Sequence, residues 1–403
     1  MTSPATNREF LLELAKATLE ALHSEPSALE SITDVGPDAV KNSLEAALDW
    51  ARLEEPAAAL EAVAPSTAAE PYIPYNQALS LLQSAYDEFI EGRGITELPF
   101  DPSDPGWKTI AEEKLKAVSR GKHPFTSHTG QNSFRYELPR DASVALFSDW
   151  GTGEATAQRV MQQIAAARPT HAIHLGDVYY AGTPKESRER FLDIVEHHGP
   201  SKDSCRYFAL AGNHDYYSGG YGYFETILPA LGQEASYFNL RNGQWQIIGL
   251  DSAYEEYGLQ KPQLEWLAAQ LDPPARRSML LSHHQLFSPY DQRVTKSTLL
   301  NKAKALLPQI YAWFWGHEHR CVIMGDHLGI KARCVGHGSI PSSVPYGEPL
   351  FPDVPVVKVD ERAAPDADGT CYHGFALLRF RTDTIDVSYI DEYGELFFEE
   401  RFE

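Results

Sequence analysis

The chain has 403 residues, 43% of them hydrophobic, and a formal net charge of −21 at pH 7. This length accommodates one large domain or two, with enough apolar side chains for a substantial core. The negative charge repels phosphate backbones and anionic lipid, which excludes long nucleic acid and membrane surfaces as expected partners. A small anionic substrate would need a locally positive site, which metal ions supply.

The N-terminal residues MTSPATNREFLLELAK lack the basic stretch and apolar core of an export signal, and no later run has the length of a membrane span. We therefore expect a cytoplasmic protein. The four cysteines stand in strand-like segments without a C-x-x-C pair, so we expect buried free thiols at Cys205, Cys321, Cys334 and Cys371.

The first quarter of the chain has helical periodicity. Apolar side chains recur at helical spacing, for example at Phe10 and Leu14 and again after Leu44. We predict a helical N-terminal module over 1–95, which either packs on the domain that follows it or offers an interaction surface. Residues 96–141 are predicted to be an irregular connector or a lid over the site. The oligomeric state stays open.

From residue 142 onward, short apolar runs alternate with amphipathic segments, which predicts an α/β domain over 142–403. The order β-α-β-α-β predicts a parallel sheet; its strands are expected at 143–149, 170–177 and 205–213, and its helices at 155–167 and 186–198. Next come a predicted hairpin with its turn at Asn242-Gly243, a helix over 261–271, and strands at 278–284 and 311–317. The strands predicted after residue 330 are expected to form a second, more antiparallel sheet.

Five polar segments follow these apolar runs: SDWG, GDVYY, GNHD, SHH and GHEH. Because ligands collect beyond the carboxyl ends of strands in α/β folds, we expect the segments to converge. Their metal-ligand side chains are Asp149, Asp177, Tyr180, Asn213, His283, His317 and His319. Oxygen donors suit hard cations, and imidazoles suit Fe, Zn, Mn or Ni. Seven donors exceed one tetrahedral ion and fit two ions that share a carboxylate.

In their order, these segments resemble the motifs of the calcineurin-like metallophosphoesterases, over roughly 142–340. The resemblance implies an α/β fold of four layers, an αββα sandwich in which two facing mixed sheets are flanked by helices. In this chain the predicted helical module precedes the sandwich at the N-terminal side of the sequence. It also implies that Asp177 bridges two ions. By the same resemblance, the first ion takes Asp149, Tyr180 and His319, and the second takes Asn213, His283 and His317.

One departure points to a branch of the family. Most members have a histidine two residues after the first Asp, where this chain has Gly151, and Tyr180 stands three residues after Asp177. This pair resembles the purple acid phosphatases, whose tyrosinate binds Fe(III). A phenol with a pKa near 10 binds a metal at neutral pH when a strongly charged cation removes its proton. We expect Fe at the first site and Fe, Mn or Zn at the second; the alternative is that Tyr180 packs beneath an ordinary dinuclear site.

The resemblance implies a metal-dependent hydrolase of small phosphate esters, in which a metal-bound hydroxide attacks phosphorus in line. His214, with Asp215 beside it, is the candidate acid for the leaving group, and His284 either contacts the phosphate or packs. A phosphomonoesterase like the purple acid phosphatases is favoured by Tyr180. The alternative is a phosphodiesterase on cyclic nucleotides or other small diesters, and a more distant one is a non-catalytic scaffold with the same fold.

Overall fold

The computed structural model describes residues 121–403 apart from 180, 256, 272–275, 291–297, 341, 343, 346–348, 352 and 366–370. The predicted helical module and residues 96–120 of the predicted connector lie outside the described residues. The chain divides into two compact units. The larger consists of Pro124–Val178, Pro184–Asn213 and Gly222–Glu403. The described part of the smaller consists of 121–123, 179, 181–183 and His214–Tyr221.

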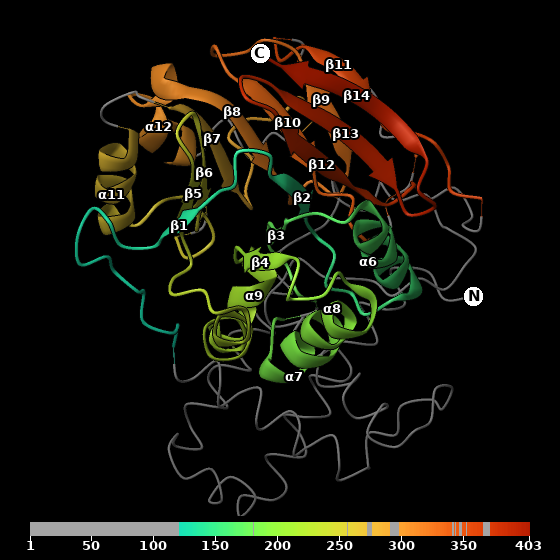
Figure 1. Cartoon of the computed structure of the whole chain (residues 1–403), viewed down its shortest axis with the longest axis horizontal. Coiled ribbons are helices and arrows are strands. Elements are labelled where there is room, and N and C mark those ends of the chain that lie inside the picture. The colour runs from blue at the N-terminus through green and yellow to red at the C-terminus, as the bar shows by residue number, and fades with distance from the viewer. Residues whose placement is uncertain are drawn as a thin grey trace, which may run out of the picture. The chain divides into compact units, whose positions relative to one another are not determined.

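Two mixed sheets form the larger unit (Figure 1). The eight-stranded sheet has the order β1 (Arg135–Glu137), β5 (Phe238–Arg241), β6 (Trp245–Leu250), β7 (Arg277–Ser282), β8 (Ile310–Trp315), β10 (Lys331–Val335), β9 (Cys321–Met324) and β11 (Val356–Val359). The six-stranded sheet has the order β14 (Leu396–Phe402), β13 (Ile385–Asp391), β12 (Gly374–Phe380), β2 (Ser143–Phe147), β3 (His171–His174) and β4 (Arg206–Ala209). In the second sheet β2, β3 and β4 run parallel, and β12 joins β2 antiparallel.

The main core lies between the two sheets, because each contributes the apolar side chains of one face. Val144 and Leu146 of β2 belong to the same buried cluster as Met279 of β7 and Phe314 of β8. The period-2 alternation of the strands predicts this, since every second side chain points to the same face. The facing sheets are therefore held together by apolar burial.

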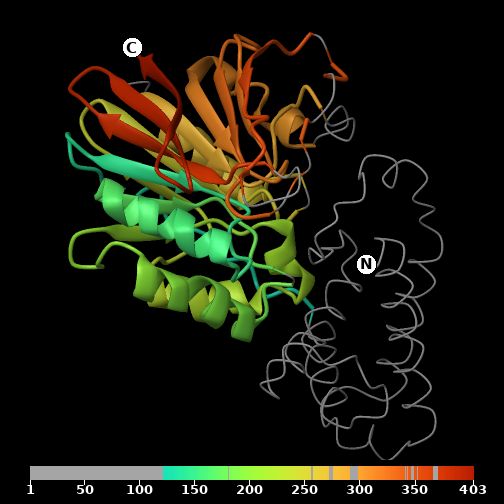
Figure 2. The ribbon, with the colours of Figure 1, turned by 90° about the vertical axis from the view of Figure 1, so that its right-hand side faces the viewer.

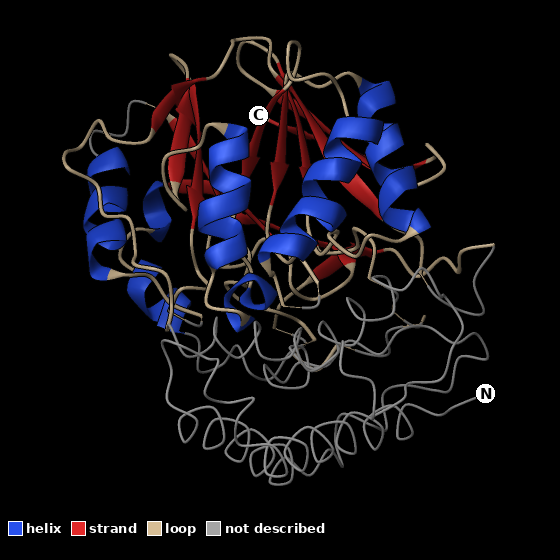
Figure 3. Cartoon of the chain, turned by 90° about the horizontal axis from the view of Figure 1, so that it is seen from below, coloured by secondary structure: helices blue, strands red, loops and turns tan. Residues whose placement is uncertain are grey.

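Helices cover the outer faces of both sheets (Figures 1 and 3). The helical segments of the larger unit are α6 (Ala155–Ala167), α7 (Pro184–Glu186), η1 (Ser187–Leu192), α8 (Asp193–His198), η2 (Tyr223–Ile227), α10 (Leu228–Leu231), α11 (Lys261–Leu271), α12 (Thr298–Ala303) and η4 (Leu307–Gln309). From His214 onward, α9 (Asn213–Tyr217) belongs to the smaller unit. Figure 2 shows α6 and α8 along the six-stranded sheet. On the eight-stranded sheet, Trp266 and Leu267 of α11 pack with Leu280 and Trp313 in a second buried cluster. The architecture is the predicted four-layer αββα sandwich.

Several sequence predictions are confirmed in detail. The helices predicted over 155–167 and 261–271 have those bounds. The hairpin turn is present, because the Asn242 amide donates to the carbonyl of Trp245 at 2.9 Å and β5 pairs antiparallel with β6. The four cysteines are buried and free. Among the described residues, no helix has both the length and the apolar character needed to cross a membrane.

The prediction that the strands after residue 330 form a separate second sheet is wrong. β12, β13 and β14 extend the sheet of β2, β3 and β4, while β10 lies parallel to β8 in the other sheet. Apolar alternation shows which face of a strand is buried, not which strand it pairs with. The short strands β1, β9 and β11 were not predicted; β1 lies within the predicted connector and pairs with β5.

Candidate metal centre

Five strand ends bring the predicted donors to one place in the larger unit. Asp149 follows β2, Asp177 follows β3 and Asn213 stands four residues after β4. From the other sheet, His283 follows β7 directly and His317 follows β8. In each sheet these strands are parallel, so their carboxyl ends lie at the same edge. The site therefore joins the two sheets.

One group of donors surrounds Nε2 of His283. This nitrogen lies 3.0 Å from Oδ1 of Asn213, 3.2 Å from Nδ1 of His317 and 3.4 Å from Oδ2 of Asp177. The opposite nitrogen, Nδ1, donates to the carbonyl of Leu175 at 3.1 Å. Because Nδ1 carries the hydrogen, Nε2 presents its lone pair to the group. These are the four donors predicted for the second ion.

The separations fit a shared metal ion. Nitrogen and oxygen ligands about 2.1 Å from an ion lie about 3.0 Å apart across an octahedral edge and about 3.4 Å apart across a tetrahedral edge. The distances around His283 cover this interval. The mixture of imidazole, amide and carboxylate donors suits Zn, Mn or Fe.

A second group consists of Asp149, Asp177 and His319, whose ligand atoms all lie within 4.8 Å of one another. Nε2 of His319 is 3.5 Å from Oδ1 of Asp149, and Oδ2 of Asp149 accepts the amide hydrogen of His317 at 2.8 Å. Asp177 thus contributes to both groups, as a bridging carboxylate must. Tyr180, the remaining predicted donor of the first ion, lies outside the described residues.

The backbone at the donors is strained. Asp149, Asp177, His317 and His319 have φ values of 54°, 75°, 67° and 48°. This left-handed region is unfavourable for residues that carry a Cβ and costs about 1–2 kcal/mol per residue. Such strain persists only when the surrounding structure imposes it, and it is concentrated at functional sites. The turns after the strands are therefore shaped to aim these side chains, at a cost in stability.

Two motif glycines allow the donors to approach the backbone. A Cβ on Gly212 would lie 2.0 Å from Oδ1 of Asp177, and a Cβ on Gly316 would lie 2.5 Å from Oδ2 of Asp149. Both separations are far shorter than van der Waals contact. The GNHD and GHEH motifs therefore need glycine for space as well as polar residues for chemistry.

Burial and the neighbouring donors set the charges of the cluster. Burial alone would raise the pKa of Asp149, but the hydrogen bond with His319 and the nearby His283 hold that pKa below its usual value. Burial lowers the pKa of His283 to about 4, so this imidazole is neutral at pH 7, the form that binds metals. The Asp149 and Asp177 side chains are 0% and 1% exposed. Buried carboxylates need cationic partners, and two metal ions would supply them.

Sequence reasoning missed two residues that support the ligands. Tyr257, from the loop after β6, places its hydroxyl 2.7 Å from Nε2 of His317. Glu318, between the two histidines of GHEH, accepts from Nε1 of Trp315 at 3.0 Å and from the hydroxyl of Ser288. Glu318 could have been suspected because it sits inside a ligand motif. No spacing in the sequence connects Tyr257 with a histidine sixty residues later.

His284 turns away from the donors that surround His283. Its Nδ1 lies 3.2 Å from the hydroxyl of Ser252, and its ring centroid is 4.2 Å from that of Tyr257. One of its ligand atoms is nevertheless within 4.8 Å of ligand atoms on His283 and His317. The distances favour His283 as the ligand and leave His284 in the wall of the site.

His214 and Asp215 belong to the smaller unit. Within that unit, the His214 ring packs between Tyr179 and Tyr217, with centroid distances of 4.5 and 4.6 Å. A Cβ on Gly182 would lie 2.4 Å from Cα of Asp215, which shows how closely those two segments pack. Their assignment to proton transfer stays a prediction.

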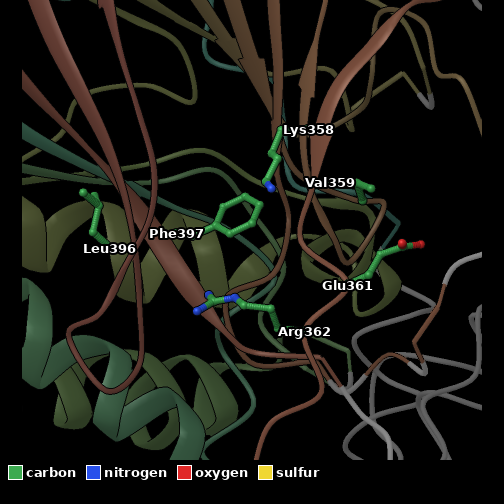
Figure 4. A pocket seen from close by; sticks show the side chains of 6 residues that line it. All are labelled: Lys358, Val359, Glu361, Arg362, Leu396 and Phe397. Carbon is green, nitrogen blue, oxygen red and sulfur yellow. The ribbon is translucent and has the colours of Figure 1, made fainter.

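A separate pocket of about 340 Å³ opens beside β11 and β14, the edge strands of the two sheets (Figure 4). It is lined by Lys358, Val359, Glu361, Arg362, Leu396 and Phe397. The Arg362 guanidinium bonds Asp360 at 2.8 Å and Asp391 at 3.0 Å, so its charge is already balanced. None of the lining residues is among the candidate metal ligands.

Comparisons with known proteins agree with this fold. Residues 142–321 match the family model of the calcineurin-like phosphoesterases, which confirms the resemblance carried by the motifs. The matched segment contains all five polar segments. Comparison with curated proteins gives no match.

Several solved structures are similar to this chain at low identity. They include GAP50, the anchor in the inner membrane complex of Plasmodium, at 12% identity and a TM-score of 0.49, covering 66% of this chain and 89% of that one. Purple acid phosphatase PPD1 from yellow lupin (Lupinus luteus) seeds has 15% identity and a TM-score of 0.45, covering 66% and 54%. A dimetal phosphatase from Danio rerio has 13% identity and a TM-score of 0.43, covering 65% and 99%.

Proposed function

We propose that this protein is a dinuclear-metal hydrolase of small phosphate esters, and that it acts as a phosphomonoesterase. The observation that carries the proposal is the group around His283, whose Nε2 lies at ligand-to-ligand distances, 3.0–3.4 Å, from donor atoms of Asn213, His317 and Asp177. A second group beside it shares Asp177. Two ions held there would supply Lewis acidity for a phosphoryl oxygen and would activate a water molecule.

The protein's own residues prepare this chemistry in three ways. The Leu175 carbonyl fixes the hydrogen of His283 on the nitrogen that faces away from the ligands. Asp149 stays ionised because its pKa is held low. His214 is proposed to hold the proton that the leaving alkoxide takes up. In this chain's acidic field, the metal pair would provide the local positive charge that attracts a phosphate.

The packing at Gly151 supports the purple acid phosphatase branch. A Cβ at this position would lie 2.9 Å from Cα of Val178 and 3.0 Å from the carbonyl oxygen of Asp177. A side chain there would force the Val178 backbone to shift, so this packing favours glycine over the histidine that most of the family places at this point. The first ion then needs another donor, and we assign this role to Tyr180, with Fe as the metal.

The proposal is tested by comparing hydrolysis of an aryl phosphate with that of its bis-aryl diester by the metal-loaded protein. A monoesterase hydrolyses the monoester much faster; the reverse order would establish the diesterase alternative instead. Asn213→Ala, which removes one donor of the second group, is expected to abolish both activities. The iron assignment predicts a tyrosinate-to-Fe(III) band in the visible spectrum that Tyr180→Phe removes.

A further inference from the structure

The two nitrogens of His317 face different partners. Nδ1 lies 3.2 Å from Nε2 of His283, inside the donor group of the second ion. Nε2 lies 2.7 Å from the hydroxyl of Tyr257. A nitrogen that binds a metal cannot carry a hydrogen. In the neutral imidazole the hydrogen therefore sits on Nε2, which donates it to the tyrosine oxygen.

His283 and His317 are held by different kinds of acceptor. His283 donates from Nδ1 to a backbone carbonyl, that of Leu175, and any residue at 175 would provide the same carbonyl. His317 donates to a side chain, so its support depends on the identity of residue 257. Partners of this kind fix the tautomer and the ring orientation of a ligand and raise its basicity.

The loop that carries Tyr257 is held firmly at its start. Oδ1 of Asp251 accepts from the amides of Ala253 at 3.1 Å and Tyr254 at 2.9 Å. The side chain of Gln263, on α11, bonds both the amide and the carbonyl of Asp251, at 2.8 and 2.9 Å. Asp251 and Gln263 are both 0% exposed, so these bonds do not compete with water.

The second half of the same loop is tied to α12. The Lys302 ammonium contacts Glu255 at 2.5 Å and donates to the carbonyl of Leu259 at 2.7 Å. Between these anchors Tyr257 has a φ of 54°, a conformation unfavourable for a bulky residue. Its ring also lies 4.2 Å, centroid to centroid, from that of His284. The loop therefore imposes a strained backbone whose result is the contact with His317.

We propose that Tyr257 is a positioning residue for the second metal ion: it fixes the hydrogen of His317 on Nε2 and holds the ring so that Nδ1 points into the donor group. This proposal rests on the dinuclear centre proposed above. It concerns the affinity of one ion and does not depend on which ester is the substrate.

The test is a calorimetric titration of metal-free protein with Zn²⁺, using Tyr257→Phe, which removes the hydroxyl and keeps the ring against His284. Tyr237→Phe is the matched control, because it removes a hydroxyl that accepts the His128 amide hydrogen at 2.8 Å. A His319→Ala background, which lacks a donor of the first group, isolates the second site. Thermal melting of each metal-free variant checks the fold.

We expect Tyr257→Phe to weaken Zn²⁺ binding at the second site by about 10- to 100-fold, and Tyr237→Phe to leave it unchanged. Histidine ¹⁵N spectra of the Zn²⁺-loaded protein should show the His317 Nε2 hydrogen protected from exchange only when Tyr257 is present. Wild-type Zn²⁺ affinity in Tyr257→Phe would overturn the role proposed for Tyr257 and would leave the dinuclear centre unaffected. A wild-type protein that binds fewer than two ions would overturn the dinuclear centre and this proposal with it.

Discussion

Gly212→Ala should disable the metal centre without changing any ligand. The new methyl carbon would lie 2.0 Å from Oδ1, 2.7 Å from Cγ and 2.6 Å from the backbone nitrogen of Asp177. Real contacts of this kind are at least about 3 Å, so the shared carboxylate must move by about 1 Å. Metal–ligand distances tolerate about 0.2 Å. A displacement of 1 Å typically costs about 100-fold in rate.

The assay is metal content per chain after gel filtration, together with the rate of aryl phosphate hydrolysis and a thermal melt. We expect Gly212→Ala to hold fewer than two ions, to lose at least about 100-fold in rate and to lose about 1–3 kcal/mol of stability through overpacking. Gly243→Ala is the control, because its Cβ would meet no atom within 4 Å. Two tightly bound ions and a normal rate in Gly212→Ala would refute the close-packing argument.

Three further predictions concern the surroundings of the site and the core. Glu318→Ala removes a carboxylate that accepts two hydrogen bonds beneath the GHEH turn, so it should cost about 1–3 kcal/mol for each buried donor left unpaired; an unchanged urea midpoint would contradict this. Burial lowers the pKa of His174 from 6.5 to about 3, so below pH 6.5 the unfolded chain binds more protons than the folded chain. The free energy of unfolding of the wild type therefore decreases as pH is lowered, and this group alone accounts for a loss of about 2 kcal/mol at pH 5. In chemical denaturation at pH 7 and pH 5, His174→Phe should lose less stability between the two pH values than the wild type does. An equal loss in both proteins would contradict the argument. Arg333→Met removes a bidentate ion pair with Glu400 at 2.6 and 2.5 Å and should destabilise the protein by about 3–5 kcal/mol, because the Glu400 carboxylate loses its partner. The double variant Arg333→Met with Glu400→Leu should recover part of this loss in chemical denaturation. If it recovers none, the ion pair does not account for the effect of Arg333→Met.

The convergence of the described candidate donors could be predicted because each follows a strand and belongs to a short motif. Asp149 and His317 are 168 residues apart, yet the prediction needed only the rule that parallel strands end at a common edge. The helices 155–167 and 261–271 were equally predictable, since their apolar periodicity is clear and their ends lie next to turn residues.

Sheet membership and the support of the ligands could not be predicted in the same way. β12 and β10 are both buried along nearly their whole length, but one pairs with β2 and the other with β8. Pairing depends on tertiary contacts that alternation does not encode. Tyr257 reaches His317 because of the path of its loop. The positive φ that allows this contact cannot be inferred from the type of residue at position 257.

The position of the centre at the junction of the two sheets has a thermodynamic consequence. Asp149, Asp177 and Asn213 come from the six-stranded sheet, and His283 and His317 come from the eight-stranded sheet. An ion bound by both sets is a cross-link that the unfolded chain cannot hold in the same way. Each ion at 100 times its dissociation constant adds about 2.7 kcal/mol to the free energy of unfolding. If the proposed centre binds its ions, metal supply would determine how much of this chain stays folded, as well as the rate of the proposed hydrolysis.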